Sequence, residues 1–120
     1  MRNNNQWTES RFNAFIKGAL RTASLKWPPR YQCLKDAYVD KRINLRTGRI
    51  GNHYRCRACN GVFPSADVQV DHIKPIIDPA VGFTHWTDVI DSMFCEACNL
   101  QTLCKACHKN KTQAEKQQRK

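Results

Sequence analysis

Two cysteine-rich stretches decide the fold of this chain: residues 54–61 read YRCRACNG, and residues 99–112 read NLQTLCKACHKNKT. Each stretch holds a pair of cysteines three positions apart, and Gly61 follows the first pair, where a zinc knuckle needs a tight turn. Zinc prefers four tetrahedral ligands, which two such pairs can supply. We therefore predict a structural zinc site formed by Cys56, Cys59, Cys104 and Cys107.

The remaining cysteines leave one alternative open. The chain has seven cysteines, and Cys95 and Cys98 form a third pair with the same spacing. Residues 1–6 lack the apolar core of an export signal, so metal ligation is favoured over disulfide formation. If Cys95 and Cys98 joined the last pair, the zinc loop would be compact, but the first pair would have no partner. We favour the first arrangement because the glycine suits a knuckle.

The distribution of charge indicates a polyanionic partner and a bound cation. The formal net charge is +10. Residues 1–55 carry twelve Lys/Arg and three Asp/Glu, residues 62–100 carry one Lys and six acids, and residues 101–120 carry six Lys/Arg and one Glu. An acidic centre between basic ends suits a protein that holds a cation and contacts phosphates from both sides. The alternative interpretation is that this charge serves only to keep the protein soluble.

Hydrophobic spacing predicts helices in the N-terminal half. Apolar residues recur at helical spacing over residues 10–26, and the segment Trp27-Pro28-Pro29 ends this helix. A second short helix is expected over residues 30–39. The basic residues 41–52 contain two glycines and are expected to form a loop or an irregular extended arm. Residues 1–53 are thus expected to form a basic helical N-terminal extension.

The C-terminal half, residues 54–120, is expected to form a domain of mixed α+β type. Residues 68–73 alternate as a strand does, and residues 100–103 form a second short strand. A helix is expected between them over residues 85–94, and a final helix from about residue 105 to residue 117.

Four polar residues form a second pattern in this half: Asp71, His72, Asn99 and His108. Asp71 and His72 are neighbours on the predicted strand, so their side chains point to opposite faces. One of them can therefore ligate a cation while the other addresses a water molecule. His108 follows Cys107 at the start of a helix, where the zinc would fix its direction.

The same residues resemble the HNH endonuclease motif. The run VDHIKP at residues 70–75 and the run at residues 99–112 carry the resemblance, which covers about residues 54–116. It includes the cysteine pairs of the zinc-containing branch of that family. The N-terminal half lies outside the motif, but its basic composition and its Trp-Pro-Pro segment are similar to those of phage-encoded members.

The resemblance implies a ββα-metal core, in which two antiparallel strands and a helix surround one catalytic divalent ion. It assigns His72 as the general base that activates water and Asn99 as the residue that orients this base. Asp71 and His108 match the ligands of the catalytic ion, and the four cysteines match the structural zinc ligands. The implied activity is hydrolysis of DNA phosphodiester bonds, with nicking as the default for a monomer and a dimer left open.

Two features depart from the family pattern. Cys95 and Cys98 directly precede Asn99, and Thr112 stands where some relatives have a further histidine. Water or substrate oxygens would therefore fill more of the ion's coordination sphere. Ligation by oxygen and nitrogen fits Mg²⁺, Mn²⁺, Ni²⁺ or Zn²⁺.

Double-stranded DNA is the expected partner, contacted from the two basic ends of the chain. Lys17 and Arg21 of the first helix belong to the basic set. The residues selected for phosphate contact are Arg42, Arg46, Arg49, Lys105, Lys109 and Lys111. Replacing such residues should weaken binding and lower its dependence on salt.

Two other functions stay open at this stage. One is a non-catalytic, zinc-dependent DNA-binding module, which would have no use for Asp71, His72 and His108. The other is a nuclease that acts on RNA or without sequence preference. No apolar run approaches the roughly 20 residues of a membrane span. An intracellular protein is expected, located in the host cytoplasm if the chain is phage-encoded.

Overall fold

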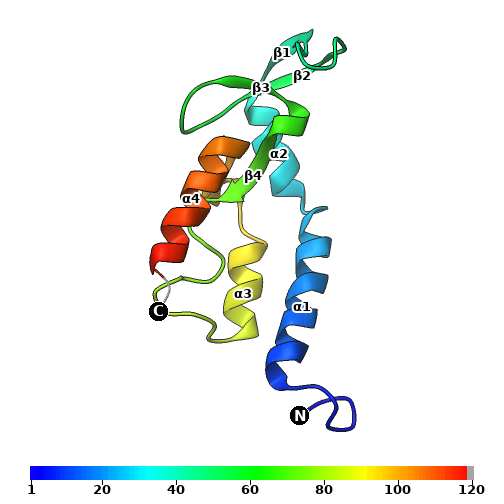
Figure 1. Ribbon diagram of the computed structural model, residues 1–120, viewed down its shortest axis with the longest axis vertical. Coiled ribbons are helices and arrows are strands. Elements are labelled where there is room, and N and C mark those ends of the chain that lie inside the picture. Colours follow the sequence, from blue (N-terminus) through cyan, green and yellow to red (C-terminus); the bar gives the residue numbers. More distant parts are fainter. Residues whose placement is uncertain (119–120) are drawn as a thin grey trace.

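The computed structural model describes residues 1–118 and shows a mixed α+β chain with two small antiparallel sheets (Figure 1). The molecule is elongated, with extents of 54 × 28 × 26 Å. Its longer elements are α1 (Glu9–Ser24), α2 (Pro28–Asp36), β1 (Tyr38–Ile43), β2 (Ile50–Arg55), β3 (Val62–Pro64), β4 (Val68–His72), α3 (Trp86–Met93), β5 (Leu100–Cys104) and α4 (Lys105–Gln118). Two short 3₁₀ turns, Ser65–Asp67 and Ala97–Asn99, precede β4 and β5.

Local signals set the ends of the first two helices. Thr8 caps α1, because its side-chain oxygen accepts a hydrogen bond from the backbone N–H of Arg11 at 3.1 Å. Pro28 begins α2, where its missing N–H costs nothing. Trp27 joins the two helices, and its indole N–H donates to the carbonyl of Cys95 at 2.7 Å. The linker is thus fixed to the segment that follows α3.

The segment expected to be a loop or an extended arm is a β-hairpin. Strands β1 and β2 pair antiparallel, with Ile43 opposite Ile50, and β3 adds a third strand beside β2. Helix α2 accordingly ends at Asp36 and not at Val39, which lies in β1. The hairpin was missed because most of its side chains face solvent, so its sequence lacks the alternation of a half-buried strand.

The predicted boundary between residues 53 and 54 falls inside β2. One neighbour of β2 in the sheet, β1, comes from before that boundary, and the other, β3, comes from after it. The change in composition at this point therefore does not coincide with a break in the sheet.

Strands β4 and β5 form a two-stranded antiparallel ribbon, here called the β4–β5 ribbon. Asp71 lies opposite Gln101 and His72 opposite Leu100. Helix α4 begins at Lys105, directly after the last residue of β5. Helices α4 and α2 both pack on the ribbon, and Figure 1 shows them on its two sides. This arrangement brings the predicted site residues of the C-terminal half together.

The buried core is small, and cysteine side chains form part of it. Val89 and Met93 of α3 are only 2% and 1% exposed, and Leu103 of β5 is 2% exposed. Leu103 forms a cluster with Cys56 and Cys104, and Phe63 packs against it. So limited a core makes a metal staple valuable for stability. Within residues 1–118, no helix has the length and apolar composition needed to cross a bilayer.

Candidate functional site

The structure brings the four predicted zinc cysteines together. The sulfur atoms of Cys56, Cys59, Cys104 and Cys107 all lie within 4.8 Å of one another. Thiolates bound at about 2.3 Å to one tetrahedral zinc ion lie roughly 3.8 Å apart, and the Cys59 and Cys104 sulfurs are 4.0 Å apart. The cluster could therefore hold a metal such as zinc.

The third cysteine pair lies outside this cluster. Among residues 1–118, no other group of three or more potential ligands comes together in the same way. Cys95 is half-buried and Cys98 is exposed, both as free thiols. The arrangement favoured from the sequence is the one that the structure shows, and the alternative pairing is not seen.

The turn between Cys56 and Gly61 leaves no room for a side chain at Gly61. The backbone N–H of Cys56 donates to the carbonyl of Gly61 at 2.8 Å, and that of Asn60 donates to the carbonyl of Cys56 at 2.9 Å. Asn60 has a left-handed φ of 62°, which asparagine tolerates better than most residues. A Cβ on Gly61 would lie 2.7 Å from the ring of Phe63 and 3.4 Å from the sulfur of Cys59.

The electrostatics of the cluster also suit a cation. Burial raises the pKa of Cys56, but hydrogen bonds from the backbone N–H groups of Cys104, Cys59 and Ala58 outweigh it and bring the pKa down to about 6. Hydrogen bonds with the neighbouring cysteine sulfurs, first that of Cys104, raise the pKa of Cys107 to about 12. Cys56 thus favours the thiolate form, whereas a second thiolate at Cys107 is opposed unless a cation binds between the sulfur atoms.

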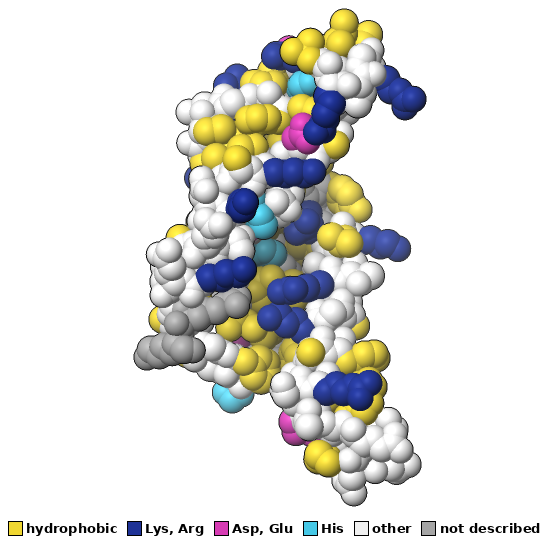
Figure 2. Space-filling view, in the orientation of Figure 1, with side chains coloured by type: hydrophobic (Ala, Val, Ile, Leu, Met, Phe, Trp, Pro, Cys, Tyr) yellow, Lys and Arg dark blue, Asp and Glu magenta, His cyan; other side chains and the backbone are white. Residues whose placement is uncertain are grey.

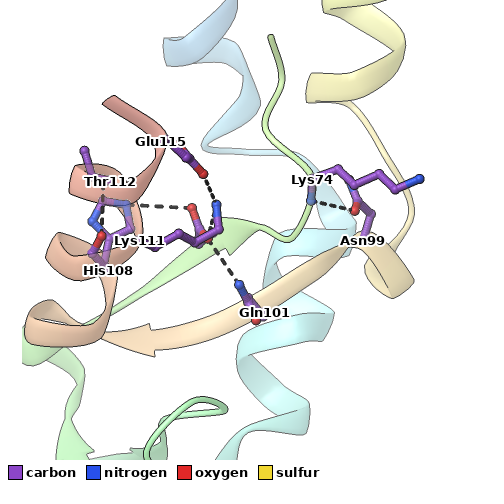
Figure 3. Close-up of polar contacts among 8 residues, drawn as sticks. Lys74, Asn99, Gln101, His108, Lys111, Thr112 and Glu115 are labelled. Atoms are coloured by element: carbon purple, nitrogen blue, oxygen red, sulfur yellow. Dashed lines mark hydrogen bonds and ion pairs between the residues drawn. The ribbon is translucent and has the colours of Figure 1, made fainter. Parts of the chain in front are cut away.

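Asp71 faces α4 and is surrounded by donors. Its Oδ2 accepts a hydrogen bond from Gln101 Nε2 at 3.3 Å and lies 3.1 Å from Nζ of Lys111. Its Oδ1 lies 3.7 Å from Nε2 of His108. Lys111 also forms an ion pair with Glu115, one helical turn further along α4 (Figure 3). The predicted pair of metal ligands, Asp71 and His108, is therefore brought together, with Lys111 beside it.

His72 contacts the C-terminal end of α3. The ring is buried, and its Nε2 lies 2.9 Å from the carbonyl oxygen of Met93. Because a carbonyl only accepts, Nε2 carries the proton in this contact, and the neutral ring keeps its lone pair on Nδ1. Met93 is the last residue of α3, where helix carbonyls lack an intrahelical donor. Asp71 and His72 thus diverge, as expected for neighbours on a strand.

Asn99 holds the chain immediately after His72. Its side-chain oxygen accepts a hydrogen bond from the backbone N–H of Lys74 at 3.1 Å (Figure 3), and its own carbonyl accepts one from Ile73 at 2.8 Å. The imidazole itself is held by the carbonyl of Met93. Asn99 therefore acts on the end of β4. The contact with the Met93 carbonyl could not be predicted, because any residue presents a backbone carbonyl.

A cleft of about 200 Å³ lies beside these residues. Helix α1 contributes Lys17 and Arg21 to its lining, so the N-terminal extension takes part in the candidate site. The other lining residues are Asp71, His72, Pro75, Ile76, Ile77, Lys111 and Glu115. A larger cavity of about 420 Å³, lined in part by Cys33 and Thr102, contains none of the site residues predicted from the sequence.

The residues predicted to contact phosphates lie in different surroundings. Arg42 forms an ion pair with Asp40, with contacts of 2.7 and 2.9 Å, and Arg46 Nη2 lies 2.9 Å from Asp67. Arg49, Lys105 and Lys109 are exposed. Lys111 differs, because its ammonium is engaged by Asp71 and Glu115 inside the site. Figure 2 shows Lys and Arg side chains along the length of one face, with few acidic ones among them.

Comparison of the chain with protein-family models, with curated proteins and with solved structures found no match.

Proposed function

We propose that this protein is a metal-dependent endonuclease of the HNH type that hydrolyses DNA phosphodiester bonds. The observation that carries the proposal is the placement of Asp71 and His72. They diverge from one strand, yet both line the same cleft, and His108 lies against the carboxylate of Asp71. The neighbouring four-cysteine cluster supports the proposal, because it fixes the start of α4, from which His108 projects.

The donor set at Asp71 fits a divalent cation. Asp71 Oδ1 and His108 Nε2 are 3.7 Å apart. This separation is shorter than two metal–ligand bonds of roughly 2.1 Å placed end to end, so both atoms can reach one ion. One carboxylate and one imidazole leave coordination positions open, as a catalytic site requires. A divalent cation held there would neutralise charge on a phosphate oxygen and on the leaving 3′ oxygen.

His72 is suited to remove a proton from water. The carbonyl of Met93 fixes the ring and its tautomer, which leaves Nδ1 as the proton acceptor. As that proton moves to Nδ1, the water oxygen bonds to phosphorus and the bond to the 3′ oxygen breaks. The 3′ oxygen then takes a proton from solvent. Asn99 supports this geometry by holding the backbone of Lys74 just beyond the base.

Helix α1 supplies positive charge to the same cleft. Lys17 and Arg21 line it on the side of the N-terminal extension. Their charges suit the non-bridging oxygens of a phosphate placed beside His72, since hydrogen bonds from cationic side chains to phosphate are stronger than neutral ones.

The test is cleavage of a supercoiled plasmid by the zinc-loaded chain with added Mg²⁺, Mn²⁺, Ni²⁺ or Zn²⁺. We expect His72→Ala to abolish cleavage and to keep the zinc content and DNA binding of the parent. His85→Ala is the matched control, because His85 is exposed at the start of α3. Full cleavage by His72→Ala would reject His72 as the base. Cleavage by neither the parent nor the control, with any of the ions, would reject the nuclease.

A second function, a non-catalytic zinc-dependent DNA-binding module, is favoured by one observation. The carboxylate of Asp71 already has partners in Gln101 and Lys111 without any metal ion, so it could serve structure alone. In that case Asp71→Asn would leave DNA binding unchanged, and no divalent ion would support cleavage.

A further inference from the structure

The tip of the β1–β2 hairpin exposes apolar side chains to solvent. Leu45 is 96% exposed, Ile50 is 71% exposed and Ile43 is 56% exposed. We call these three residues the hairpin tip. Ile43 and Ile50 are direct partners across the two strands, so their side chains lie on the same face, and Leu45 projects from the turn that follows Ile43. Exposure of this kind marks a contact surface when the patch is contiguous.

The turn that carries Leu45 is rigidly braced. The backbone N–H of Asn44 donates to the carbonyl of Arg49 at 2.8 Å, and that of Gly48 donates to the carbonyl of Asn44 at 2.7 Å. The side-chain oxygen of Asn44 also accepts a hydrogen bond from the backbone N–H of Arg46 at 2.9 Å. Gly48 has a φ of 73°, which glycine adopts freely. Leu45 is thus held outward by a fixed turn, so inserting it elsewhere would cost little ordering entropy.

Positive charges surround this apolar tip. Between residues 40 and 50 the chain has one acidic residue, Asp40, against four cations: Lys41, Arg42, Arg46 and Arg49. Arg42 and Arg46 are tied to Asp40 and Asp67 in ion pairs exposed to solvent. Such pairs contribute little to stability, so the arginines can exchange these partners for phosphates.

We propose that the hairpin enters a groove of duplex DNA and that Leu45 inserts between neighbouring base pairs as a wedge. Proteins that bind DNA through β-strands use the minor groove as well as the major groove, and the minor groove is the one from which apolar wedges enter the base stack. Apolar side chains that unstack a base step, with cations on the adjacent phosphates, are a known means of bending DNA. The proposal rests on the proposed DNA substrate and adds a second contact, since the hairpin occupies one end of the molecule, beyond the β4–β5 ribbon (Figure 1).

The chemistry of the tip favours DNA over a second copy of this chain. Two tips brought together would place like charges against each other, because Lys41 and Arg42 directly precede Ile43 and Arg49 directly precedes Ile50. Three aliphatic side chains also fall well short of the roughly 800 Å² per partner that a stable protein interface buries. Duplex DNA offers both an apolar stack and negative charge within reach of the same ribbon.

The experiment measures DNA unwinding, because a wedge that unstacks base pairs changes the twist of the duplex wherever it binds. A closed plasmid is relaxed by a topoisomerase in the presence of zinc-loaded His72→Ala protein, which leaves the strands intact. We expect a shift in the topoisomer distribution. With Leu45→Ala added, the shift should disappear at equal occupancy, and binding should weaken about ten-fold with an unchanged salt slope, since no charge is removed.

Two controls separate the wedge from other effects. Leu25→Ala removes a leucine that is 60% exposed at the end of α1 and should change nothing. Arg46→Ala should lower the salt slope by about one and keep the shift per bound molecule. The same shift with and without Leu45 would reject the wedge, as would a parent dimer that Leu45→Ala converts to monomer.

Failure of the wedge and failure of the nuclease are distinguishable. The wedge alone would be rejected if the parent cleaves the plasmid and Leu45→Ala leaves the topoisomer shift unchanged. A Leu45-dependent shift from a chain that cleaves with no ion would reject the nuclease alone and retain the hairpin as a DNA contact.

Discussion

Nζ of Lys111 lies 3.1 Å from Oδ2 of Asp71, so an ammonium group already neutralises the carboxylate that we expect to bind a divalent ion. Burial lowers the pKa of Lys111, but hydrogen bonds to Glu115 and Asp71 and attraction to both carboxylates outweigh it, and the pKa lies above its usual value. Lys111 therefore stays charged near neutral pH. A divalent ion bound at Asp71 has to coexist with this charge or displace it.

Removing the charge of Lys111 should strengthen binding of a divalent ion at Asp71. Two like charges about 4 Å apart interact by a few kcal/mol at an effective dielectric constant near 20, and partial exposure reduces this. We expect Lys111→Met to bind Mn²⁺ about ten-fold more tightly, as measured by calorimetry on the zinc-loaded chain. Lys105→Met, at an exposed position of the same helix, is the control. Weaker Mn²⁺ binding by Lys111→Met would show instead that the lysine organises the site.

The ion pairs of Lys111 should also give stability a dependence on pH. Because the pKa of Lys111 is raised in the folded chain, its contribution is complete below the unfolded value of about 10.4 and is lost as the pH rises through the folded value. Urea unfolding of the parent and of Lys111→Met should therefore differ most near neutral pH. The difference should shrink under strongly alkaline conditions, and a constant difference would contradict the assignment.

The cysteine pairs should differ in their effect on zinc content. Cys107→Ser removes a ligand of the four-cysteine cluster, and structural zinc contributes of order 10 kcal/mol to the folding of small domains. We expect this variant to lose stoichiometric zinc and to unfold at a markedly lower temperature. The double variant Cys95→Ser/Cys98→Ser should keep one zinc per chain. Zinc loss from the double variant, measured by metal analysis, would show that the third pair takes part.

Two glycines should respond to alanine in opposite directions. Gly61→Ala places a Cβ 2.7 Å from the ring of Phe63, which has to move within the packed cluster, so we expect a loss of about 1–3 kcal/mol. Gly18 lies within α1 and has nothing within 4 Å of an added Cβ. Gly18→Ala should therefore stabilise the chain by roughly 0.5–1 kcal/mol. Thermal unfolding of the two variants, with zinc present, checks both values.

The parts of the site that the sequence predicted depend on short-range spacing. The cysteine pairs could be assigned because a three-residue spacing already fixes the bite of a knuckle. Their juxtaposition with each other followed from the need of zinc for four ligands. Asp71 and His72 could be placed on opposite faces because strand geometry has a period of two. Apart from the meeting of the two cysteine pairs, which the metal requires, each constraint acts between near neighbours in the chain.

The parts that the sequence could not show depend on contacts between distant elements. The partner of His72 is the backbone carbonyl of Met93, which any residue at that position would present. Lys111 was expected to be a phosphate contact because its charge alone does not reveal that α4 turns it toward Asp71. Lys17 and Arg21 line the cleft only because α1 folds back toward the β4–β5 ribbon. The β1–β2 hairpin could not be predicted because most of its side chains face solvent, so its sequence lacks an alternating hydrophobic pattern.

Helix α4 begins directly after β5, and its first turn carries Cys107 and His108 side by side. One turn of helix therefore sets the position of a thiolate in the cysteine cluster and of the imidazole beside Asp71. An inserted residue in that turn would rotate everything beyond it by about 100° around the helix axis. Since no loop separates strand from helix to absorb the change, natural variation in the length of this junction would have to disrupt the cysteine cluster and the contact of His108 with Asp71 together.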